Sequence, residues 1–272
     1  MPGNPLVSVI TVVRNGKEHI AQTIQSVLGQ SYDNIEYIII DGGSTDGTLD
    51  IIQRYDDRIA YWISEPDRGI SDAFNKGITA STGQIIGLVN SDDWMSLDQV
   101  ERGVQSLLAS SADFVFGDLL MHDSHGATKH VIHGDPLYAK RITSKMPELN
   151  HPTVLVNRHA YERIGLFETG YHYAMDYEWM LRLHKSGGVG LYASAIIGHM
   201  RESGISHRMF ICSLREVRRI AIHYGQPAAA AYYLYIYRVI KGTARRALER
   251  WIPRSLYQKI RGMVNPRYSS GS

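Results

Sequence analysis

The chain has 272 residues, of which 44% are hydrophobic and 21% charged, a composition typical of one large globular domain or of one domain with an appendage. Its single cysteine, Cys212, excludes an intramolecular disulfide, a thiolate zinc cluster and a paired redox motif. The N-terminal sequence lacks the features of a secretory signal, and no window reaches the roughly 18 apolar residues of a spanning helix. We therefore expect a protein on the cytoplasmic side of the membrane.

The first hundred residues repeat a pattern of strand, loop and helix. Short apolar runs predict buried strands at residues 6–13, 35–40, 59–64 and 85–89, and helical spacing of apolar residues predicts helices at 17–30 and 49–55. Strands that lack polar alternation and are separated by helices are typical of a parallel sheet covered on both faces.

Three of these strands end in polar residues. Arg14 and Asn15 follow the first strand, Asp41 and the turn-rich GGSTDG follow the second, and NSDD at 90–93 follows the strand that ends at Val89. Ligands of such sheets bind beyond the carboxyl ends of the strands, so these groups are expected to face one crevice. Two interpretations of NSDD stay open: a helix cap for a helix beginning near Trp94, or a site for Mg²⁺ or Mn²⁺ and phosphate.

Two common nucleotide-binding motifs are missing from the sequence. The first loop has no G-x-G-x-x-G, and no G-x-x-x-x-G-K-[ST] occurs anywhere, which disfavours a dinucleotide cofactor and a P-loop ATPase. Without a glycine cradle, a phosphate-bearing ligand has to be held by a metal ion and basic side chains.

Four stretches, in order along the chain, resemble the nucleotide-sugar glycosyltransferases of family 2. They are VSVITVVRN (7–15), IEYIIIDGGSTDGT (35–48), SEPDRGISDAFNKGITASTGQIIGLVNSDDW (64–94) and NHPTVLVNRHAYERIGLFETGYHYAMDYEWMLRL (150–183). The likeness covers about residues 6–210. It implies an α/β fold of the GT-A type (Rossmann-like), with a mixed, mostly parallel sheet flanked by helices and, here, a C-terminal helical extension.

The resemblance also implies a donor site. Asp41 matches the carboxylate that hydrogen-bonds the base, usually uracil, and NSDD matches the D-x-D metal motif, with Asn90 in place of its first Asp. Asn90 can still bind a ribose hydroxyl but adds no charge, so Asp92 is the preferred ligand for Mg²⁺ or Mn²⁺ and Asp93 the next. The predicted nucleotide-sugar-binding residues are Val13, Arg14, Asn15, Asp41, Arg68, Asp72, Asn75, Asn90 and Ser91.

A helix beginning near Met175 carries Asp176 and Glu178 in its first turn, where acidic residues are favoured for structural reasons alone. The resemblance makes Asp176 the general base that deprotonates an acceptor hydroxyl, with Glu178 a candidate acceptor contact. One base and one metal ion imply a single displacement with inversion, and hence a β-linkage from an α-linked donor.

The histidines need separate treatment. His151 is either an acceptor contact or a structural residue at a strand start, and His199 is a candidate third metal ligand. The group His122, His125, His130 and His133 looks like a zinc cluster, but two strands around a turn at 123–126 distribute these side chains over both faces. We interpret them as hairpin residues.

The C-terminal segment is strongly basic. Residues 238–272 contain nine Lys and Arg residues and a single acidic residue, Glu249, so the rest of the chain is net acidic. Ten apolar residues at 228–237 precede an amphipathic stretch that ends at Pro253. This helix fits an anionic membrane surface, or else it packs on the catalytic domain or a dimer partner. No nucleic-acid recognition motif accompanies the charge.

We thus expect a GT-A domain at residues 1–210, with a nucleotide-sugar half at about 1–118 and an acceptor half at about 119–210, and a basic helical extension at 211–272. The predicted function is inverting, metal-dependent transfer from a nucleotide-sugar donor, with a UDP-sugar favoured, to a glycan or lipid-linked acceptor in cell-surface polysaccharide synthesis. The alternatives are an inactive glycan-binding or scaffold relative and a nucleotidyltransferase. The enzyme is expected in the cytoplasm or peripherally on the cytoplasmic face of the inner membrane.

Overall fold

The computed structural model describes residues 3–123, 126–202 and 209–251, the last seven by their backbone alone. The strands are β1 (Val7–Val13), β2 (Ile35–Asp41), β3 (Tyr61–Ser64), β4 (Ile85–Asn90), β5 (Trp94–Met95), β6 (Phe114–His122), β7 (Thr128–Ile132), β8 (Leu155–Asn157) and β9 (Gly190–Arg201). The α-helices are α1 (Ile20–Leu28), α2 (Thr48–Gln53), α3 (Ile70–Ala80), α4 (Gln99–Leu108), α5 (Tyr138–Arg141), α6 (Arg158–Ile164), α7 (Met175–Lys185), α9 (Phe210–His223) and α10 (Ala228–Trp251). Two short 3₁₀ helices are η1 (Asp56–Arg58) and η2 (His151–Thr153).

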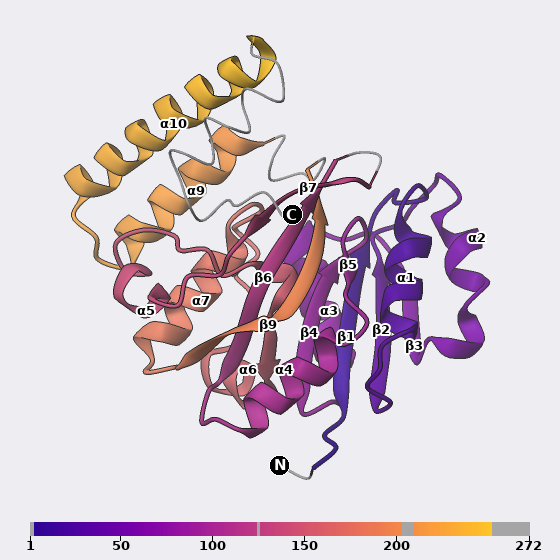
Figure 1. Ribbon diagram of the computed structural model, residues 1–272. Helices are drawn as coiled ribbons and strands as arrows, with labels where there is room; N and C mark the ends of the chain where they lie inside the picture. Colours follow the sequence, from indigo (N-terminus) through magenta and orange to yellow (C-terminus); the bar gives the residue numbers. More distant parts are fainter. Residues whose placement is uncertain (1–2, 124–125, 203–208, 252–272) are drawn as a thin grey trace.

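The described strands form one sheet in the order β3-β2-β1-β4-β8-β6-β9-β5, with β7 paired to β6 (Figure 1). β3, β2, β1 and β4 are mutually parallel, and β6 is parallel to β9. The short β8 is antiparallel to both of its neighbours and joins these two parallel parts. The prediction of a mixed, mostly parallel sheet with helices on its faces is confirmed.

Each face of the sheet has its own apolar layer. Ile10 and Val12 of β1 belong to the layer formed with α3, α6 and α7, whereas Val9 and Val13 belong to the layer formed with α1, α2 and α4. This division follows from the period of two in a strand, which sends successive side chains to opposite faces. Because both layers are apolar, the strands read as continuous hydrophobic runs in the sequence.

The elements at the end of the chain agree with the sequence only in part. β6 and β7 form the expected antiparallel hairpin, although turn residues Ser124 and His125 lie outside the described residues. The expected basic helix is present as α10, while Pro253 and the basic residues beyond it also lie outside them. α9 and α10 pack side by side, and no helix in the described part is long and apolar enough to cross a membrane (Figure 1).

The division of the chain at residue 210 stays a prediction. α9 begins at Phe210, and its inner side buries Leu214, Val217 and Ile220. Val217 and Ile220 belong to the same apolar layer as α7. The first of the two C-terminal helices, α9, therefore packs against the body of the fold.

Gly77 on α3 allows the helix to approach the sheet closely. A Cβ atom at this position would lie 2.4 Å from Cγ2 of Ile10, a β-branched core residue that has little freedom to move. We expect Gly77→Ala to lower the free energy of unfolding by about 1–3 kcal/mol, because overpacking outweighs the gain in helix propensity. Urea unfolding measures the change.

Thr79→Ala is the matched control, since Thr79 is exposed on the same helix. It raises helix propensity without a steric conflict, and we expect it to leave stability within about 0.5 kcal/mol of the wild type. A Gly77→Ala protein as stable as this control would show that the close approach of α3 is not a constraint.

Candidate active site

The carboxyl ends of three adjacent parallel strands meet at one edge of the sheet. Val13, at the end of β1, is in register with Asp41 at the end of β2, and Val12 is in register with Asn90 at the end of β4. The convergence that the sequence predicts for these strand ends is therefore present in the fold. The loops that leave them form the walls of the candidate site.

The loop after β1 is fastened to the loop after β2. Asn15 has a positive φ of 54°, and its backbone N–H donates to Ser44 Oγ at 2.7 Å. Its side-chain Oδ1 accepts from the backbone N–H of Thr45 at 2.9 Å. Asn15 thus braces the two loops, while Arg14 beside it is exposed at the edge of the site.

Asp41 is fully buried and anchors the loop that follows it. Its Oδ2 accepts from the backbone N–H groups of Gly43 at 3.0 Å and Ser44 at 2.8 Å. Ser64 Oγ also donates to Oδ2, at 2.6 Å, and Ser44 Oγ donates to Oδ1. The carboxylate is therefore rigidly placed at the end of β2, and its contact with a base stays a prediction.

The turn after β4 is not a helix cap. Trp94 begins the short strand β5, and the next helix, α4, follows only after it, so the cap interpretation of NSDD is wrong. The backbone N–H of Asp93 donates to the carbonyl oxygen of Asn90 at 3.1 Å, which closes a tight turn. Thr23 Oγ1 of α1 lies 2.9 Å from the carbonyl oxygen of Ser91 and 2.7 Å from that of Asp93.

The two carboxylates of this turn differ in environment. Asp93 is buried, and its Oδ2 accepts from Nδ2 of Asn90 at 3.0 Å, whereas Asp92 is half-buried. Burial raises the pKa of Asp93 well above its ordinary value, and the charge of Asp92 raises it further. Within the described residues, Oδ1 of Asp93 and Oδ1 of Asn90 are buried without a hydrogen-bond partner.

These groups fit a divalent cation. Mg²⁺ and Mn²⁺ prefer oxygen ligands, and a cation beside two carboxylates would compensate the buried charge and the unpartnered oxygens. No three His, Cys, Asp or Glu side chains gather into a metal-binding group within the described ranges. The chain thus offers Asp92 and Asp93, and substrate phosphates would complete the shell, as is common for Mg²⁺.

His199 is engaged by the protein itself. Its Nε2 lies 2.9 Å from Ser96 Oγ, and its Nδ1 lies 3.0 Å from Nε2 of His122. Burial, together with His122, lowers the pKa of His199 to about 4. Both ring nitrogens are therefore occupied, and this arrangement leaves no nitrogen of His199 free to bind a metal ion.

A cluster of aromatic and cationic side chains, Trp94, His199 and Arg201, lies next to the turn at 90–93. Sequence analysis did not predict it. The ring of Trp94 stacks on His199 with 5.0 Å between centroids, and the guanidinium of Arg201 lies 4.6 Å from the Trp94 centroid. Arg201 is buried, donates to Gln22 of α1, and places a positive charge near Asp93. One signal for this cluster was available in the sequence: side chains alternate between the two faces of a strand, so His199 and Arg201 of β9 lie on the same face.

The residues predicted on the segment around α3 are largely bound to neighbours. Asp72 accepts from the backbone N–H and from Nη2 of Arg68, both at 3.1 Å, and the backbone N–H is the main cause of its lowered pKa. Nδ2 of Asn75 donates to the carbonyl oxygen of Phe167 at 2.8 Å, and Oδ1 of Asn75 accepts from the backbone N–H of Phe167 at 2.9 Å. Asn75 thus fixes the segment before α7, and exposed Arg68 is the cation that a ligand can reach.

Asp176 lies in the first turn of α7, beside His151. Asp176 Oδ1 accepts from the backbone N–H of Tyr177 at 2.8 Å. His151 is in η2 rather than at a strand start, and its ring lies 5.7 Å from that of Phe74. Burial lowers the pKa of His151 below its ordinary value, which Asp176 only partly opposes, so the imidazole is neutral near pH 7.

A cleft of about 560 Å³ connects the two halves of the candidate site. Its lining includes Asn90 at the end of β4 and both His151 and Asp176 from the acceptor half. Asp41, Arg68 and Glu178 are not part of this lining. The structure therefore brings Asn90, the first residue of the NSDD motif, and the candidate base to one opening, whereas Asp92 and Asp93 are not among its lining residues.

Glu178, the other predicted acceptor contact, is buried away from this cleft. Its carboxylate binds Nε and Nη2 of Arg182, at 3.0 and 3.1 Å, and accepts from the hydroxyl of Tyr224. Burial and the charge of Glu178 raise the pKa of Tyr224. These contacts give Glu178 a structural role, joining α7 to the end of α9.

Glu216 of α9 is a second buried carboxylate that sequence analysis missed. It accepts from the backbone N–H of His172 at 2.9 and 3.1 Å, of Tyr173 at 2.7 Å and of Ala174 at 3.0 Å. These N–H groups precede α7, where a negative charge is favoured by the helix dipole. Glu216 therefore fixes the start of the helix that carries Asp176.

Comparison with known proteins identifies the family. Residues 8–165 match the model of glycosyl transferase family 2, and the chain belongs to this family. It is 39% identical over 115 residues to a putative teichuronic acid biosynthesis glycosyltransferase of Bacillus subtilis, a match that covers 41% of this chain and 46% of that protein. An uncharacterized glycosyltransferase of Mycobacterium tuberculosis is 28% identical over 230 residues, or 77% of this chain and 87% of its own length. The chain thus spans about half the length of the Bacillus relative and most of the mycobacterial one.

Solved structures confirm the GT-A fold. A mannosyltransferase from Pyrobaculum calidifontis in complex with GDP-Man and Mn²⁺ matches with a TM-score of 0.65 and 17% identity, over 98% of this chain and 83% of that one. The S. aureus TarS 1–349 complex with UDP-GlcNAc matches with a TM-score of 0.62 and 16% identity, over 83% and 69% of the two chains. At these identities the likeness concerns the fold.

Removal of the Glu216 carboxylate tests its role at the start of α7. We expect Glu216→Ala to lower the free energy of unfolding by about 1–3 kcal/mol, since three N–H groups, of which that of Ala174 is buried, lose a charged acceptor. Hydrogen exchange at the amides of residues 172–174 should accelerate more than that of amides in β1. Glu168→Ala, at an exposed position nearby, is the control and should change neither quantity. Unchanged exchange at 172–174 would contradict the role assigned to Glu216.

Proposed function

We propose that the chain is an inverting, metal-dependent glycosyltransferase of hexosyl type that uses a nucleotide diphosphate donor, preferentially a UDP-sugar. The acceptor is a glycan or lipid-linked glycan of cell-surface polysaccharide synthesis. One observation carries this proposal: a single cleft is lined both by Asn90, from the metal-motif turn, and by Asp176, the candidate base. An inverting transfer needs the base and the leaving diphosphate on opposite sides of one anomeric carbon, and this cleft reaches from the turn proposed to hold the diphosphate to the candidate base.

The donor half supports nucleotide-sugar binding. Val13, Arg14, Asn15 and Asp41 belong to two loops fastened to each other at the strand ends, so that their positions are fixed before a ligand arrives. Two solved structures of this fold are complexes with UDP-GlcNAc and with GDP-Man. We favour UDP here because Asp41 occupies the position at which members of the family bind uracil.

The residues that would bind the metal ion lie in the turn after β4. Asp92 is the accessible carboxylate and Asp93 the buried one behind it, and together they supply the oxygen ligands and the negative charge that Mg²⁺ or Mn²⁺ requires. When bound, the ion neutralises charge that develops on the departing nucleoside diphosphate. Asn90 and Ser91 are then left to contact the ribose or phosphate.

Asp176 acts as the general base. It accepts the proton of the acceptor hydroxyl while that oxygen forms a bond to the anomeric carbon and the bond from this carbon to the diphosphate oxygen breaks, its electron pair leaving with the nucleotide. Neutral His151 beside it offers the acceptor one donor and one acceptor nitrogen for hydrogen bonding. One such displacement inverts the configuration at the anomeric carbon.

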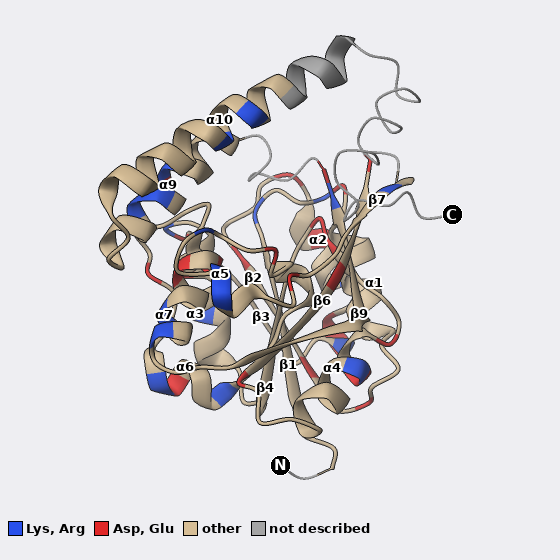
Figure 2. Cartoon of the chain, turned by 60° about the vertical axis from the view of Figure 1, so that its left-hand side comes forward, with Lys and Arg blue, Asp and Glu red and all other residues tan. Residues whose placement is uncertain are grey.

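The exposed side of α10 supports binding to an anionic membrane surface. Tyr233, Ile236, Tyr237 and Ile240 are exposed along this helix, and Lys241 lies next to them. Apolar residues combined with Lys and Arg, drawn blue in Figure 2, are the features of an interfacial helix. A peripheral location on the cytoplasmic face of the inner membrane follows from this proposal.

Donor binding provides the first test. In titration calorimetry with UDP-, GDP-, dTDP- and CMP-sugars, we expect one donor to bind at least about tenfold more tightly with Mn²⁺ than with EDTA, and Asp92→Ala to abolish this difference. Asp98→Ala, which removes an α4 carboxylate paired with Arg102, should behave as the wild type. If no nucleotide sugar binds in either condition, the enzyme assignment fails.

The role of Asp176 requires a different measurement. Asp176→Asn keeps an oxygen that can accept from the backbone N–H of Tyr177, so the start of α7 should be preserved. We expect transfer to fall by about 10²–10⁴-fold while the donor dissociation constant stays within about twofold of the wild type. Equal losses of binding and transfer would argue for a structural role, and Glu162→Gln, exposed on α6, is the control.

A further inference from the structure

The cleft that holds Asp176 extends to the C-terminal helices. Its lining runs from Asn90 and His151 to Phe210 and Leu214 of α9 and to Arg238 and Lys241 of α10. Its volume of about 560 Å³ lies within the range of roughly 300–1,000 Å³ that is usual for sites enclosing a whole ligand. The opening next to the candidate base is therefore one end of a longer site.

The part of the cleft near α10 has an apolar wall. Met146 and Leu214 line it beside Arg238, and Phe210 closes against α10 at Gly242. Sugar rings present hydroxyl groups that need hydrogen-bond partners, and this wall offers few. Hydrocarbon suits it, and methionine side chains adapt readily to a flexible chain.

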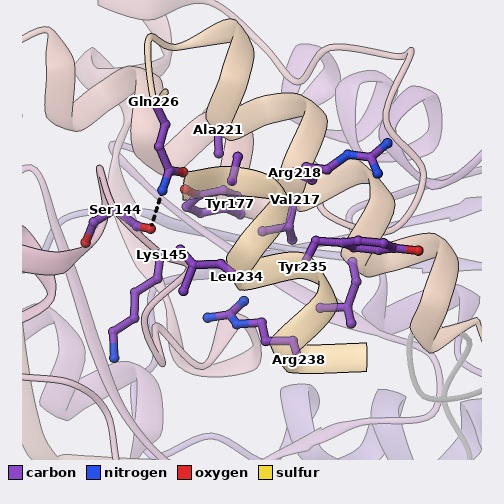
Figure 3. Close-up of a pocket in the computed structure, with 12 residues that line it drawn as sticks. Ser144, Lys145, Tyr177, Val217, Arg218, Ala221, Gln226, Leu234, Tyr235 and Arg238 are labelled. Carbon is purple, nitrogen blue, oxygen red and sulfur yellow. Dashed lines mark hydrogen bonds between the residues drawn. The ribbon is translucent and has the colours of Figure 1, made fainter. Parts of the chain in front are cut away.

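The same end of the cleft is cationic. Arg238 reaches inward from α10, where it also lines the small pocket drawn in Figure 3, and donates to the neutral carbonyl oxygen of Met146 at 3.1 Å. Burial lowers the pKa of Arg238, which shows that its charge is poorly solvated. Lys241, one helical turn further on, is exposed, and Glu148 is the one described acidic residue of the lining near them. An anion bound here would gain two cations against one carboxylate.

We propose that the acceptor is an amphipathic anion, a glycan carried on a lipid phosphate, and that its phosphate binds to Arg238 and Lys241. The first part of the lipid chain lies on the apolar wall, and the terminal sugar points toward Asp176. This inference rests on the proposed function and deepens it by naming the acceptor class. The lipid leaves the cleft beside the exposed face of α10, which is the face that suits a membrane surface.

The test uses farnesyl phosphate, below its micelle concentration, and the full chain in EDTA, with binding measured by titration calorimetry. Binding should weaken at least tenfold in Arg238→Gln and in Lys241→Gln and should be retained in Arg215→Gln, which removes an exposed α9 charge outside the cleft. Inorganic phosphate alone should bind at least tenfold more weakly than farnesyl phosphate. Arg238→Lys keeps the charge and should recover part of the affinity. This recovery would show that the loss in Arg238→Gln comes from the missing charge and not from misfolding.

Three results would overturn the inference: no binding of farnesyl phosphate, equal weakening in Arg238→Gln, Lys241→Gln and Arg215→Gln, or displacement by UDP, which would put the ligand in the donor site.

Vesicles of phosphatidylglycerol distinguish binding to a membrane surface from binding of the acceptor in the cleft. Binding to the vesicles should fall similarly in Lys241→Gln and Arg215→Gln. Donor binding with Mn²⁺ is measured on the same proteins. If the donor binds and farnesyl phosphate does not, this inference fails alone; if the donor does not bind, the proposed function fails.

Discussion

The burial of Asp93 beside Asp92 is the constraint around which the candidate site is built. Two adjacent carboxylates at the end of an apolar strand are costly unless each is paired or bound to a cation. The fold supplies part of the compensation for Asp93 through Nδ2 of Asn90 and through the backbone N–H and the charge of Arg201. It leaves one oxygen of Asp93 buried and without a hydrogen-bond partner in the described structure. A chain that needed only a tight turn here would have no use for the second carboxylate.

A second carboxylate, Glu216, makes the C-terminal helices part of the active-site architecture. It reaches from α9 to the three N–H groups that precede α7. It therefore fixes the start of α7, the helix that carries Asp176. The same α9 packs on α10, whose Arg238 and Lys241 line the cleft. The position of the candidate base and the shape of the acceptor end of the cleft therefore depend on one packed unit, even though the family match ends at residue 165.

The sequence predicts well what local patterns encode. The strands at the start of the chain, the helix that begins at Met175 and the polar ends of β1, β2 and β4 all follow from apolar runs and their chain order. The sequence does not predict contacts between distant segments, such as the pairing of Trp94 with His199 or the insertion of β8 between β4 and β6. These depend on the twist and register of the whole sheet, and a strand of three residues such as β8 is too short to have a periodic signal of its own.

The segment Asp176-Tyr177-Glu178 shows why the motif alone could not assign roles. Two residues apart on an α-helix correspond to a rotation of about 200°, so these carboxylates leave α7 on nearly opposite sides. One side faces the cleft and His151, whereas the other faces Arg182 and Tyr224 in the interior. A carboxylate buried in the interior cannot take a proton from a substrate that it does not meet. Of two acidic residues that look equivalent in the sequence, the packing of α7 against α9 leaves Asp176 at the cleft and Glu178 in the interior.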